Sequence, residues 1–184
     1  MSGEGGNNMR MCTITLAGGC FWCLEAVYLR VAGVTAVQSG YANGHLPQPS
    51  YEQVCRGDTG HAEVVQLQYD PTQVELRALL EVFYAVHDPT SLNRQGNDVG
   101  PQYRSGIYWS DPADEPVVRA VTAEADALLG GGVVTELAPL SGFWPAEPEH
   151  DRYFERNPWQ GYCAFVVGPK VAKFQQRFTS LLRR

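Results

Sequence analysis

Short apolar stretches alternate along the chain with segments whose apolar residues recur at helical spacing. The stretches typical of β-strands cover residues 13–17, 34–41, 62–69, 105–109 and 133–139. The segments with helical periodicity cover residues 21–30, 74–86, 111–129 and 171–182. The first six elements follow the split βαβ order of a ferredoxin-like sheet with helices on one face. We therefore expect an α/β protein, built as an α+β two-layer sandwich: a ferredoxin-like βαββαβ core with an extended C-terminal tail and helix.

The spacing of these elements predicts one domain. The chain has 184 residues, enough to bury a substantial core, and neither an internal repeat nor a long linker divides it. Residues 1–10 are polar and glycine-rich, which predicts a flexible N-terminal tail, so residues 11–184 are expected to form the domain. Residues 88–104 read as a polar loop. Residues 141–168 are expected to form a wrapped, partly mobile tail with a short helix at 149–156.

Charge and composition exclude several classes of function. The net charge of −6 disfavours nucleic-acid and anionic-membrane surfaces, because both attract clustered Lys and Arg. No apolar stretch approaches the roughly 20 residues needed to cross a bilayer, and no secretion signal is recognisable. Five cysteines are an odd number and too few for a secreted disulfide scaffold. We expect a cytoplasmic protein with redox-active or metal-binding thiols.

The richest chemical signal is Cys20-Phe21-Trp22-Cys23, which follows a strand and two glycines and opens a helix. At a helix start, free backbone N–H groups and the positive end of the dipole favour a thiolate over a thiol. Two aromatic residues directly after the sulfur place an apolar surface beside it. This combination predicts nucleophilic chemistry on a small, apolar, electrophilic group.

The Cys-x-x-Cys spacing leaves several interpretations open. Residues one helical turn apart have Cβ atoms about 5–6 Å apart, whereas a disulfide needs roughly 3.5–4.5 Å, so a bridge requires modest distortion. Two inert buried thiols are an alternative. A zinc site would need two further ligands at suitable spacing, and the sequence offers no second Cys-x-x-Cys and no His-x-His. We expect no metal.

Four other features could carry chemistry, each with a simpler structural interpretation. Glu63 begins an apolar strand, where partial burial would raise its pKa and allow proton donation near neutral pH; an exposed strand end is the alternative. Tyr41 ends a strand and could offer its phenol. Residues 93–104 are dense in hydrogen-bonding side chains, although such loops are often only solvated. Cys163 follows Pro158 and Gly161, where mobility could bring it to a distant thiol; an inert core cysteine is the alternative.

Taken together, these segments resemble the A-type peptide methionine sulfoxide reductases. The matching segments occur in family order and span residues 13 to 163; they are Gly19-Cys20-Phe21-Trp22 with Glu25, Gly40-Tyr41-Ala42, residues 57–65, Tyr69-Asp70-Pro71, residues 87–90, residues 94–98, residues 102–105, Asn157-Pro158 and Gly161-Tyr162-Cys163. The resemblance implies thiol-dependent reduction of methionine sulfoxide, of the S epimer, both free and in oxidised proteins. It implies no bound cofactor, and electrons from thioredoxin or a similar dithiol.

The resemblance also implies roles for individual residues. Cys20 is the nucleophile that attacks the sulfoxide sulfur and becomes a sulfenic acid, while Phe21 and Trp22 enclose the methyl group. The residues that hydrogen-bond the sulfoxide oxygen are Tyr41, Glu63 and Tyr103. Glu63 is the expected proton donor, and Asp98 supports the site.

Two departures from the family leave the resolving thiol undecided. Position 23 is often glycine in the family but is Cys23 here, and Cys163 occupies the usual resolving position. The sulfenic acid could therefore be resolved by Cys23, by Cys163, or by both in relay. Residues 149–153 depart from the family's usual His-Gln-x-Tyr. Cys12 and Cys55 receive no role and are expected to be structural thiols.

Two other functions compete with this interpretation. A general dithiol–disulfide oxidoreductase would also carry Cys-x-x-Cys near a βαβ pattern, but it does not explain the Phe-Trp insert or the segments around Glu63 and Asp98. A non-catalytic module whose aromatic residues bind a peptide is the second alternative.

Overall fold

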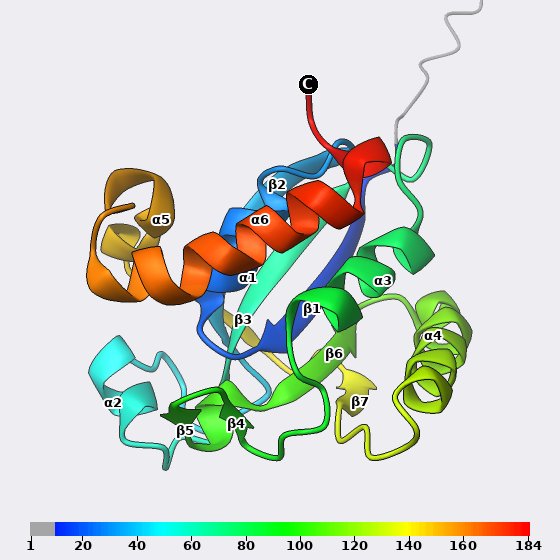
Figure 1. Cartoon of the computed structure of the whole chain (residues 1–184). Coiled ribbons are helices and arrows are strands. Elements are labelled where there is room, and N and C mark those ends of the chain that lie inside the picture. Colours follow the sequence, from blue (N-terminus) through cyan, green and yellow to red (C-terminus); the bar gives the residue numbers. More distant parts are fainter. Residues whose placement is uncertain (1–9) are drawn as a thin grey trace, which may run out of the picture.

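A curled six-stranded sheet lies at the centre of the computed structural model, which describes residues 10–184 (Figure 1). Its strands are β1 (Cys12–Gly18), β2 (Val34–Ala42), β3 (Ala62–Tyr69), β6 (Ser105–Trp109), β7 (Glu136–Pro139) and β8 (Phe143–Pro145). They are arranged in the order β7-β6-β1-β3-β2-β8. All neighbouring strands are antiparallel except β6 and β7, which are parallel. The result is a mixed α/β fold.

Apolar residues of the central strands are buried on both faces of the sheet. On one face, Ile14, Leu16, Val65, Leu67 and Ile107 belong to the main core. The opposite face carries a smaller cluster, formed by Ala17, Ala42, Ala62, Val64 and Tyr108. Because successive side chains of a strand point to opposite faces, the pairing of Leu16 with Val65 sets which residues enter which core.

Helices cover the face of the main core. They include α1 (Phe21–Tyr28), α3 (Leu76–Val86) and α6 (Gly168–Arg177), and α6 lies across α1 and α3 (Figure 1). Helix α4 (Glu115–Leu128), preceded by the 3₁₀ turn η2 (Pro112–Asp114), packs beside α3. The shorter elements are α2 (Tyr51–Cys55), η3 (Pro148–His150), α5 (Tyr153–Arg156) and η5 (Thr179–Leu181).

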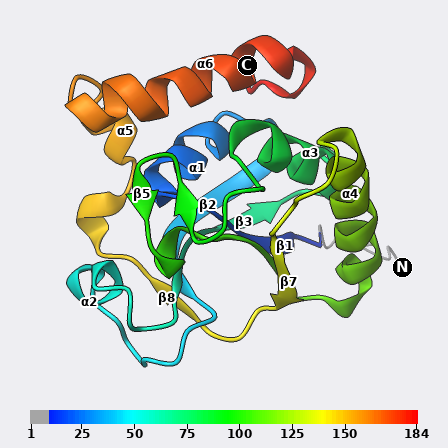
Figure 2. The same cartoon turned by 60° about the horizontal axis from the view of Figure 1, so that its bottom comes forward.

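The chain between β7 and β8 closes the opposite face of the sheet. These two strands lie at opposite edges, so the connection passes from one edge to the other (Figure 2). Ala138, Leu140 and Phe143 pack against the smaller cluster. The backbone N–H of Ser141 donates to Asn43 Oδ1 at 2.7 Å, which fixes this crossing.

Several local predictions were wrong. Residues 88–104 are not only loop: they contain the hairpin β4 (Arg94–Gln95) with β5 (Asp98–Val99) and the 3₁₀ turn η1 (Pro101–Tyr103). The helix expected at 149–156 is interrupted at Arg152, whose φ is 51°. Helix α2 was not predicted, although Ser50 and Gln53 form a capping box at its start. Five residues are too few to show helical periodicity.

The C-terminal helix also begins earlier than expected. Helical conformation starts at residue 161 and runs through η4 (Cys163–Val167), a π-helical turn, into α6. Cys163 therefore lies within a helical run and not on an irregular segment. Pro158 and Gly161 come before the turn that holds it.

Two further predictions concern the ends of the chain and membranes. The flexible tail expected at residues 1–10 lies outside the described residues, apart from Arg10. Within residues 10–184, every helix is too short or too polar to span a bilayer.

Candidate active site

A glycine turn between β1 and α1 places Cys20 at the start of the helix. Gly19 has a φ of 89°, and a Cβ atom there would lie 2.5 Å from Gln95 Cγ. Only glycine avoids both the strained backbone and this overlap. Cys20 is then the half-buried N-cap residue of α1, and its carbonyl accepts from the Cys23 N–H at 3.1 Å. The predicted strand–glycine–helix setting is confirmed.

Glu63 on β3 reaches the same helix start. The backbone N–H of Phe21 donates to Glu63 Oε1 at 3.3 Å, and the side chain is 1 % exposed. Burial raises the pKa of this carboxyl to about 8; the Phe21 N–H opposes the rise and the Asp98 carboxylate adds to it. The expected raised pKa is confirmed, and the exposed alternative is excluded. Glu63 is largely a neutral acid at pH 7.

The expected effect of the helix start on Cys20 is overruled by its surroundings. Burial raises the pKa of the Cys20 thiol well above its usual range, and the nearby Glu63, Cys23 and Asp98 raise it further. The backbone N–H of Trp22 lowers the pKa but does not compensate. The prediction of a resting thiolate is therefore wrong, because burial beside acidic groups outweighs the helix end. A neutral Glu63 removes part of the charge repulsion.

The two aromatic residues after Cys20 point into one aromatic cluster. Phe21 is fully buried, with its ring centroid 5.8 Å from that of Tyr41 and 6.4 Å from that of Tyr51. Trp22 is partly exposed and stacks on Tyr153 at 3.7 Å with an interplanar angle of 5°. Its indole N–H donates to His150 Nδ1 at 3.2 Å. The wall beside Cys20 is thus apolar and tightly positioned.

Tyr41 is held by an acid that sequence analysis did not single out. Its hydroxyl donates to Glu147 Oε2 at 3.1 Å, and the Tyr51 backbone N–H donates to Glu147 Oε1 at 3.1 Å. Nε2 of His150 lies 3.4 Å from Glu147 Oε2. The Tyr41 hydroxyl is therefore oriented by Glu147 from the connection between β8 and α5.

Asp98 and Tyr103 come from the predicted polar segment. The Tyr162 hydroxyl donates to Asp98 Oδ2 at 2.7 Å, which connects β5 to the C-terminal helical run. Burial raises the pKa of Tyr103, and negative charge on Glu63, Asp98 and Cys20 adds to the rise. These residues therefore lie within one electrostatic neighbourhood.

The two candidate resolving thiols lie on packed helices. Cys23 and Cys163 are buried and free, at 1 % and 0 % exposure. Burial raises the pKa of Cys23, and charge on Cys163 raises it further. Charge on Cys23 in turn raises the pKa of Cys20.

The structural role expected for Cys55 does not fit its position, because this thiol is exposed on α2.

Sequence analysis missed five residues that contact the predicted ones: Tyr51, Glu147, His150, Tyr153 and Tyr162. Most lie in the aromatic C-terminal region. The sequence signal that could have indicated them is an acid and a histidine placed between aromatic residues.

Ligand atoms of Glu147, Glu149 and His150 lie within 4.8 Å of one another, a grouping that could hold a metal ion. However, Nδ1 of His150 already accepts from Trp22, and Glu147 accepts from Tyr41 and Tyr51. These hydrogen bonds within the protein explain why Glu147 and His150 lie close together without a metal ion.

Comparisons with known proteins agree on the family. A sequence profile of the peptide methionine sulfoxide reductase family matches residues 12–182. The peptide methionine sulfoxide reductase MsrA of Ralstonia nicotianae is 51% identical over 179 residues, covering 93% of each chain. Reduced Mxr1 from Saccharomyces cerevisiae superimposes with a TM-score of 0.81 at 36% identity, covering 85% of this chain and 91% of that one.

A second yeast structure, of Mxr1 in complex with Trx2, superimposes with a TM-score of 0.58 at 27% identity, covering 80% of this chain and 87% of that one. The profile match over nearly the whole chain and the 51% identity are sufficient for assignment. The chain belongs to the peptide methionine sulfoxide reductase family, of the MsrA type, and is an oxidoreductase.

Proposed function

We propose that this enzyme reduces the S epimer of methionine sulfoxide, free and in oxidised proteins, with Cys20 as the nucleophile. The observation that carries this proposal is the placement of a buried carboxyl and a thiol at one helix start: Phe21 N–H donates to Glu63, and Cys20 is the N-cap residue of the same helix. Attack at sulfur needs the thiol, and departure of the oxygen needs a proton. The start of α1 thus brings together a thiol from the β1–α1 turn and a carboxyl from β3.

The surrounding residues fit the roles that the family resemblance implies. Trp22 and Phe21 form the apolar wall that receives the methyl group, and the stacked Tyr153 keeps the Trp22 ring in place. Tyr103 binds the sulfoxide oxygen together with Glu63, and Tyr41 joins them when its hydroxyl turns from Glu147 to the substrate. Asp98 orders the site through its hydrogen bond with Tyr162.

The first step balances as a two-electron oxidation of the enzyme. Sγ of Cys20 attacks the sulfoxide sulfur, and Glu63 gives its proton to the oxygen. The oxygen moves from the substrate sulfur to Cys20, and the proton lost by the thiol restores Glu63. The products are methionine and a sulfenic acid on Cys20.

We infer that the sulfenic acid is resolved in relay. Cys23 is one helical turn from Cys20, and charge on Cys23 raises the pKa of Cys20, while charge on Cys163 raises the pKa of Cys23. Cys23 thus lies within electrostatic reach of both other thiols. Cys23 would condense with the sulfenic acid and release water, forming a Cys20–Cys23 disulfide. The Cys163 thiol would then attack Cys23 Sγ, breaking the Cys20–Cys23 bond, forming a Cys23–Cys163 disulfide and releasing Cys20 as the thiol.

A dithiol protein closes the cycle. We propose thioredoxin or a similar dithiol as the reductant. Its two thiols are oxidised to a disulfide, and Cys20, Cys23 and Cys163 are all thiols again. The complex of the related Mxr1 with Trx2 supports this choice. The need for a reduced thiol pool favours the cytoplasm as the location.

We propose that the scaffold also has the finer architecture that the sequence predicts. The order β6-β1-β3-β2, with every pair antiparallel, supports a ferredoxin-like βαββαβ core to which β7 and β8 are added. We treat residues 11–184 as one catalytic domain. Mobility of residues 141–168 would be needed for the exchange at Cys163.

The direct test is Cys20→Ser. We expect loss of at least about 10³-fold in turnover of dabsyl-methionine-S-sulfoxide with dithiothreitol as the electron donor, because the nucleophile is removed. Methionine release is measured by chromatography, with the R epimer as the stereochemical control. Appreciable turnover by the variant would contradict the proposal. Rapid insulin reduction without sulfoxide reduction by the wild type would instead favour a general oxidoreductase.

The relay is tested with Cys163→Ser and Cys23→Ser. For Cys163→Ser we expect a normal first turnover but steady-state rates with thioredoxin reduced by about tenfold or more, because the Cys23–Cys163 disulfide proposed as the substrate of thioredoxin cannot form. Cys23→Ser should also spare the first turnover. Mass spectrometry after one equivalent of substrate should find Cys20–Cys23 trapped in Cys163→Ser. If Cys163→Ser kept the wild-type steady-state rate with thioredoxin, Cys163 would have no role in the catalytic cycle.

A further inference from the structure

His150 is a buried histidine that the proposed mechanism does not use. It is 6 % exposed, and its ring lies among aromatic residues, with ring centroids 4.6 Å from that of Tyr51 and 5.2 Å from that of Phe21. Both ring nitrogens face a partner. Nδ1 accepts from the Trp22 indole N–H at 3.2 Å, and Nε2 lies 3.4 Å from Glu147 Oε2. The imidazole therefore stands between the aromatic wall and an acid.

These contacts decide where the proton of His150 lies. An indole N–H can only donate, so Nδ1 needs a free lone pair to accept from Trp22. In a neutral imidazole the proton then lies on Nε2, beside the Glu147 carboxylate. The opposite tautomer and the doubly protonated ring would each set two N–H donors against each other at Trp22. Only the neutral tautomer protonated at Nε2 satisfies both contacts.

The bond from Trp22 to His150 supplies a restraint that stacking does not. Tyr153 stacks on the Trp22 indole at 3.7 Å with an interplanar angle of 5°, which fixes the plane of the indole. Stacked rings can still turn within that plane, because dispersion contacts are individually weak and have little directional preference. A hydrogen bond at the edge of the indole is directional and fixes this rotation. The two contacts together give the Trp22 wall one orientation.

Glu147 connects this restraint to the oxygen side of the site. Its Oε2 accepts from the Tyr41 hydroxyl at 3.1 Å, and its Oε1 accepts from the Tyr51 backbone N–H at 3.1 Å. The backbone N–H of His150 donates to the Glu147 carbonyl at 3.0 Å, so the two residues belong to one turn. The carboxylate that orients Tyr41 is therefore also the group that faces His150 Nε2.

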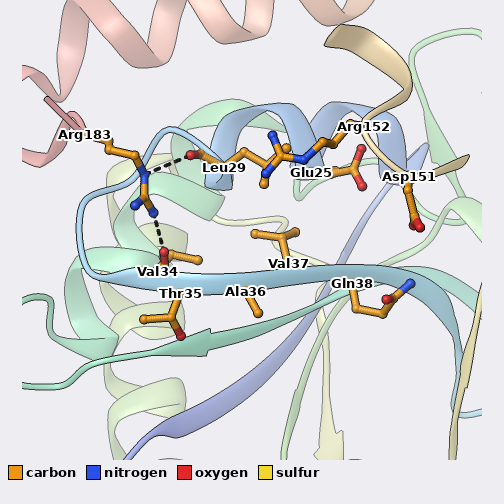
Figure 3. A pocket seen from close by; sticks show the side chains of 10 residues that line it. All are labelled: Glu25, Leu29, Val34, Thr35, Ala36, Val37, Gln38, Asp151, Arg152 and Arg183. Atoms are coloured by element: carbon orange, nitrogen blue, oxygen red, sulfur yellow. Dashed lines mark hydrogen bonds between the residues drawn. The ribbon is translucent and has the colours of Figure 1, made fainter. Parts of the chain in front are cut away.

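The chain after His150 borders open space. Asp151 and Arg152 line one side of a cavity of about 490 Å³, and residues 34–38 of β2 line the other (Figure 3). A cavity offers fewer contacts to hold a segment than a filled core does. Arg152 also has the left-handed φ of 51°, which a non-glycine residue keeps only where contacts hold it. The side-chain contacts of His150 therefore matter for keeping this segment, and Trp22 with it, in place.

We propose that Glu147 and His150 form a positioning pair that determines how large a substituent the site accepts on the sulfoxide sulfur. The neutral His150 ring, protonated at Nε2 beside Glu147, fixes the Trp22 wall at a separation from Tyr41 that suits a methyl group. This inference rests on the proposed roles of Trp22 and Tyr41. Both residues of the pair act through these two side chains and touch neither the substrate nor the sulfur of Cys20.

The first experiment locates the His150 proton in the wild-type enzyme. Long-range proton–nitrogen NMR correlation at pH 8 should show Nε2 with a proton and Nδ1 without one, and His150→Phe assigns these signals by their loss. The Trp22 indole resonance, assigned with Trp22→Phe, should shift in His150→Phe because its acceptor is gone. A proton on Nδ1 in the wild type would overturn the inference. No substrate is needed, so this result is independent of the proposed function.

The second experiment compares the S sulfoxides of methionine and of ethionine, whose ethyl group is one methylene larger. We expect the wild type to favour the methyl substrate by about tenfold in kcat/KM, a discrimination typical of one methylene in an apolar pocket. In His150→Phe, which keeps an aromatic ring but has no acceptor, this ratio should fall about fivefold. In Glu147→Leu it should fall about threefold, because Nε2 of His150 loses its partner. A ratio cancels any loss of folded enzyme, so a purely structural role would leave it unchanged.

Two variants test whether Glu147 and His150 act as a pair. The double variant Glu147→Leu with His150→Phe should have the same ratio as His150→Phe alone, because both residues act along one path. A further fall in the double variant would contradict the pair. Glu149→Gln is the control for loss of a neighbouring negative charge: Glu149 is exposed and next to His150, and the ratio should stay at the wild-type value. A fall equal to that of Glu147→Leu would assign the effect to charge and overturn the inference.

Trp22→Phe separates this inference from the proposed function. It removes the indole N–H and narrows the wall, so the preference for the methyl substrate should fall. If it falls in Trp22→Phe but not in His150→Phe, the inference fails while the proposed wall stands. An unchanged ratio in Trp22→Phe overturns both.

Discussion

Burial acts on Cys20 and Glu63 in the same direction, but with opposite consequences for the reaction. It raises the pKa of both groups, which favours a protonated Glu63 at neutral pH, as its proposed role as proton donor requires, and keeps Cys20 a thiol. The site therefore starts with two protons in place. Attack by sulfur and protonation of the oxygen can then proceed together, and no free thiolate needs to persist beside Glu63 and Asp98.

For Glu63→Gln we expect kcat to fall by about 10²-fold or more, the usual contribution of a general acid. The pKa of about 8 means that wild-type activity should decline as pH rises through that value, because the donor loses its proton. The variant should lack this alkaline decline. The measurement is kcat/KM from pH 6 to 9.5, with Glu52→Gln on the exposed side of α2 as control. A variant that keeps both its rate and the alkaline decline would exclude Glu63 as the donor.

At this scale the sequence was informative for residues close to a strand or helix boundary. Cys20 and Glu63 were predicted at the ends of secondary-structure elements, and the structure brings them to one helix start. Glu147 and His150 could not be placed from sequence, because their contacts with Tyr41 and Trp22 join residues more than 100 positions apart. The pKa of Cys20 was predicted in the wrong direction because burial is a property of the fold.

Among the secondary-structure elements, the β1–α1 turn contributes most to the site. Gly19 gives the turn its positive φ, and Gln95 from the β4–β5 hairpin packs directly over it. Gln95 is itself fixed by accepting from the Asp88 N–H at 2.8 Å and donating to the Asp88 carbonyl at 2.7 Å. The predicted polar loop thus supports the turn that carries Cys20.

We predict that Gly19→Ala destabilises the protein more than Gly130→Ala. Both glycines have positive φ, 89° and 79°, so each substitution incurs about 1–2 kcal/mol of backbone strain. At Gly19 the added Cβ also meets Gln95, whereas nothing lies within 4 Å at Gly130. Urea unfolding and kcat should show additional destabilisation and loss of activity for Gly19→Ala only. Equal effects of the two substitutions would show that the contact with Gln95 does not contribute to the destabilisation.

At the scale of the whole molecule, α6 joins the C-terminal thiol to the core. Phe174 is fully buried beneath this helix, and η4 with Cys163 continues directly into it. Because α6 lies across α1 and α3, the helix that carries Cys163 packs over the helix that carries Cys20 and Cys23 (Figure 1). The helical segments that carry Cys20 and Cys163, residues 143 positions apart, are thereby packed against each other.

We predict that Phe174→Ala lowers the free energy of unfolding by about 3–5 kcal/mol, because it leaves a cavity in the main core. Phe165→Ala is the matched control: this ring lies on the same helical run but is 83% exposed, so its removal should change stability by about 0.5 kcal/mol or less. Denaturant titration followed by far-ultraviolet circular dichroism gives both values. A loss below about 1 kcal/mol for Phe174→Ala would show that α6 is not part of the cooperative core.

The sequence by itself determined the local elements and the reacting groups, because hydrophobic periodicity, glycine turns and the Cys-Phe-Trp-Cys motif are written in neighbouring residues. It therefore predicted β1, α1, β3 and the thiol at the helix start. Only the tertiary structure decided the protonation states and the aromatic surroundings. Burial and contacts such as Glu147 with Tyr41, or Tyr153 with Trp22, arise when distant segments fold over the sheet, and it is these contacts that fix the charge and orientation of the site.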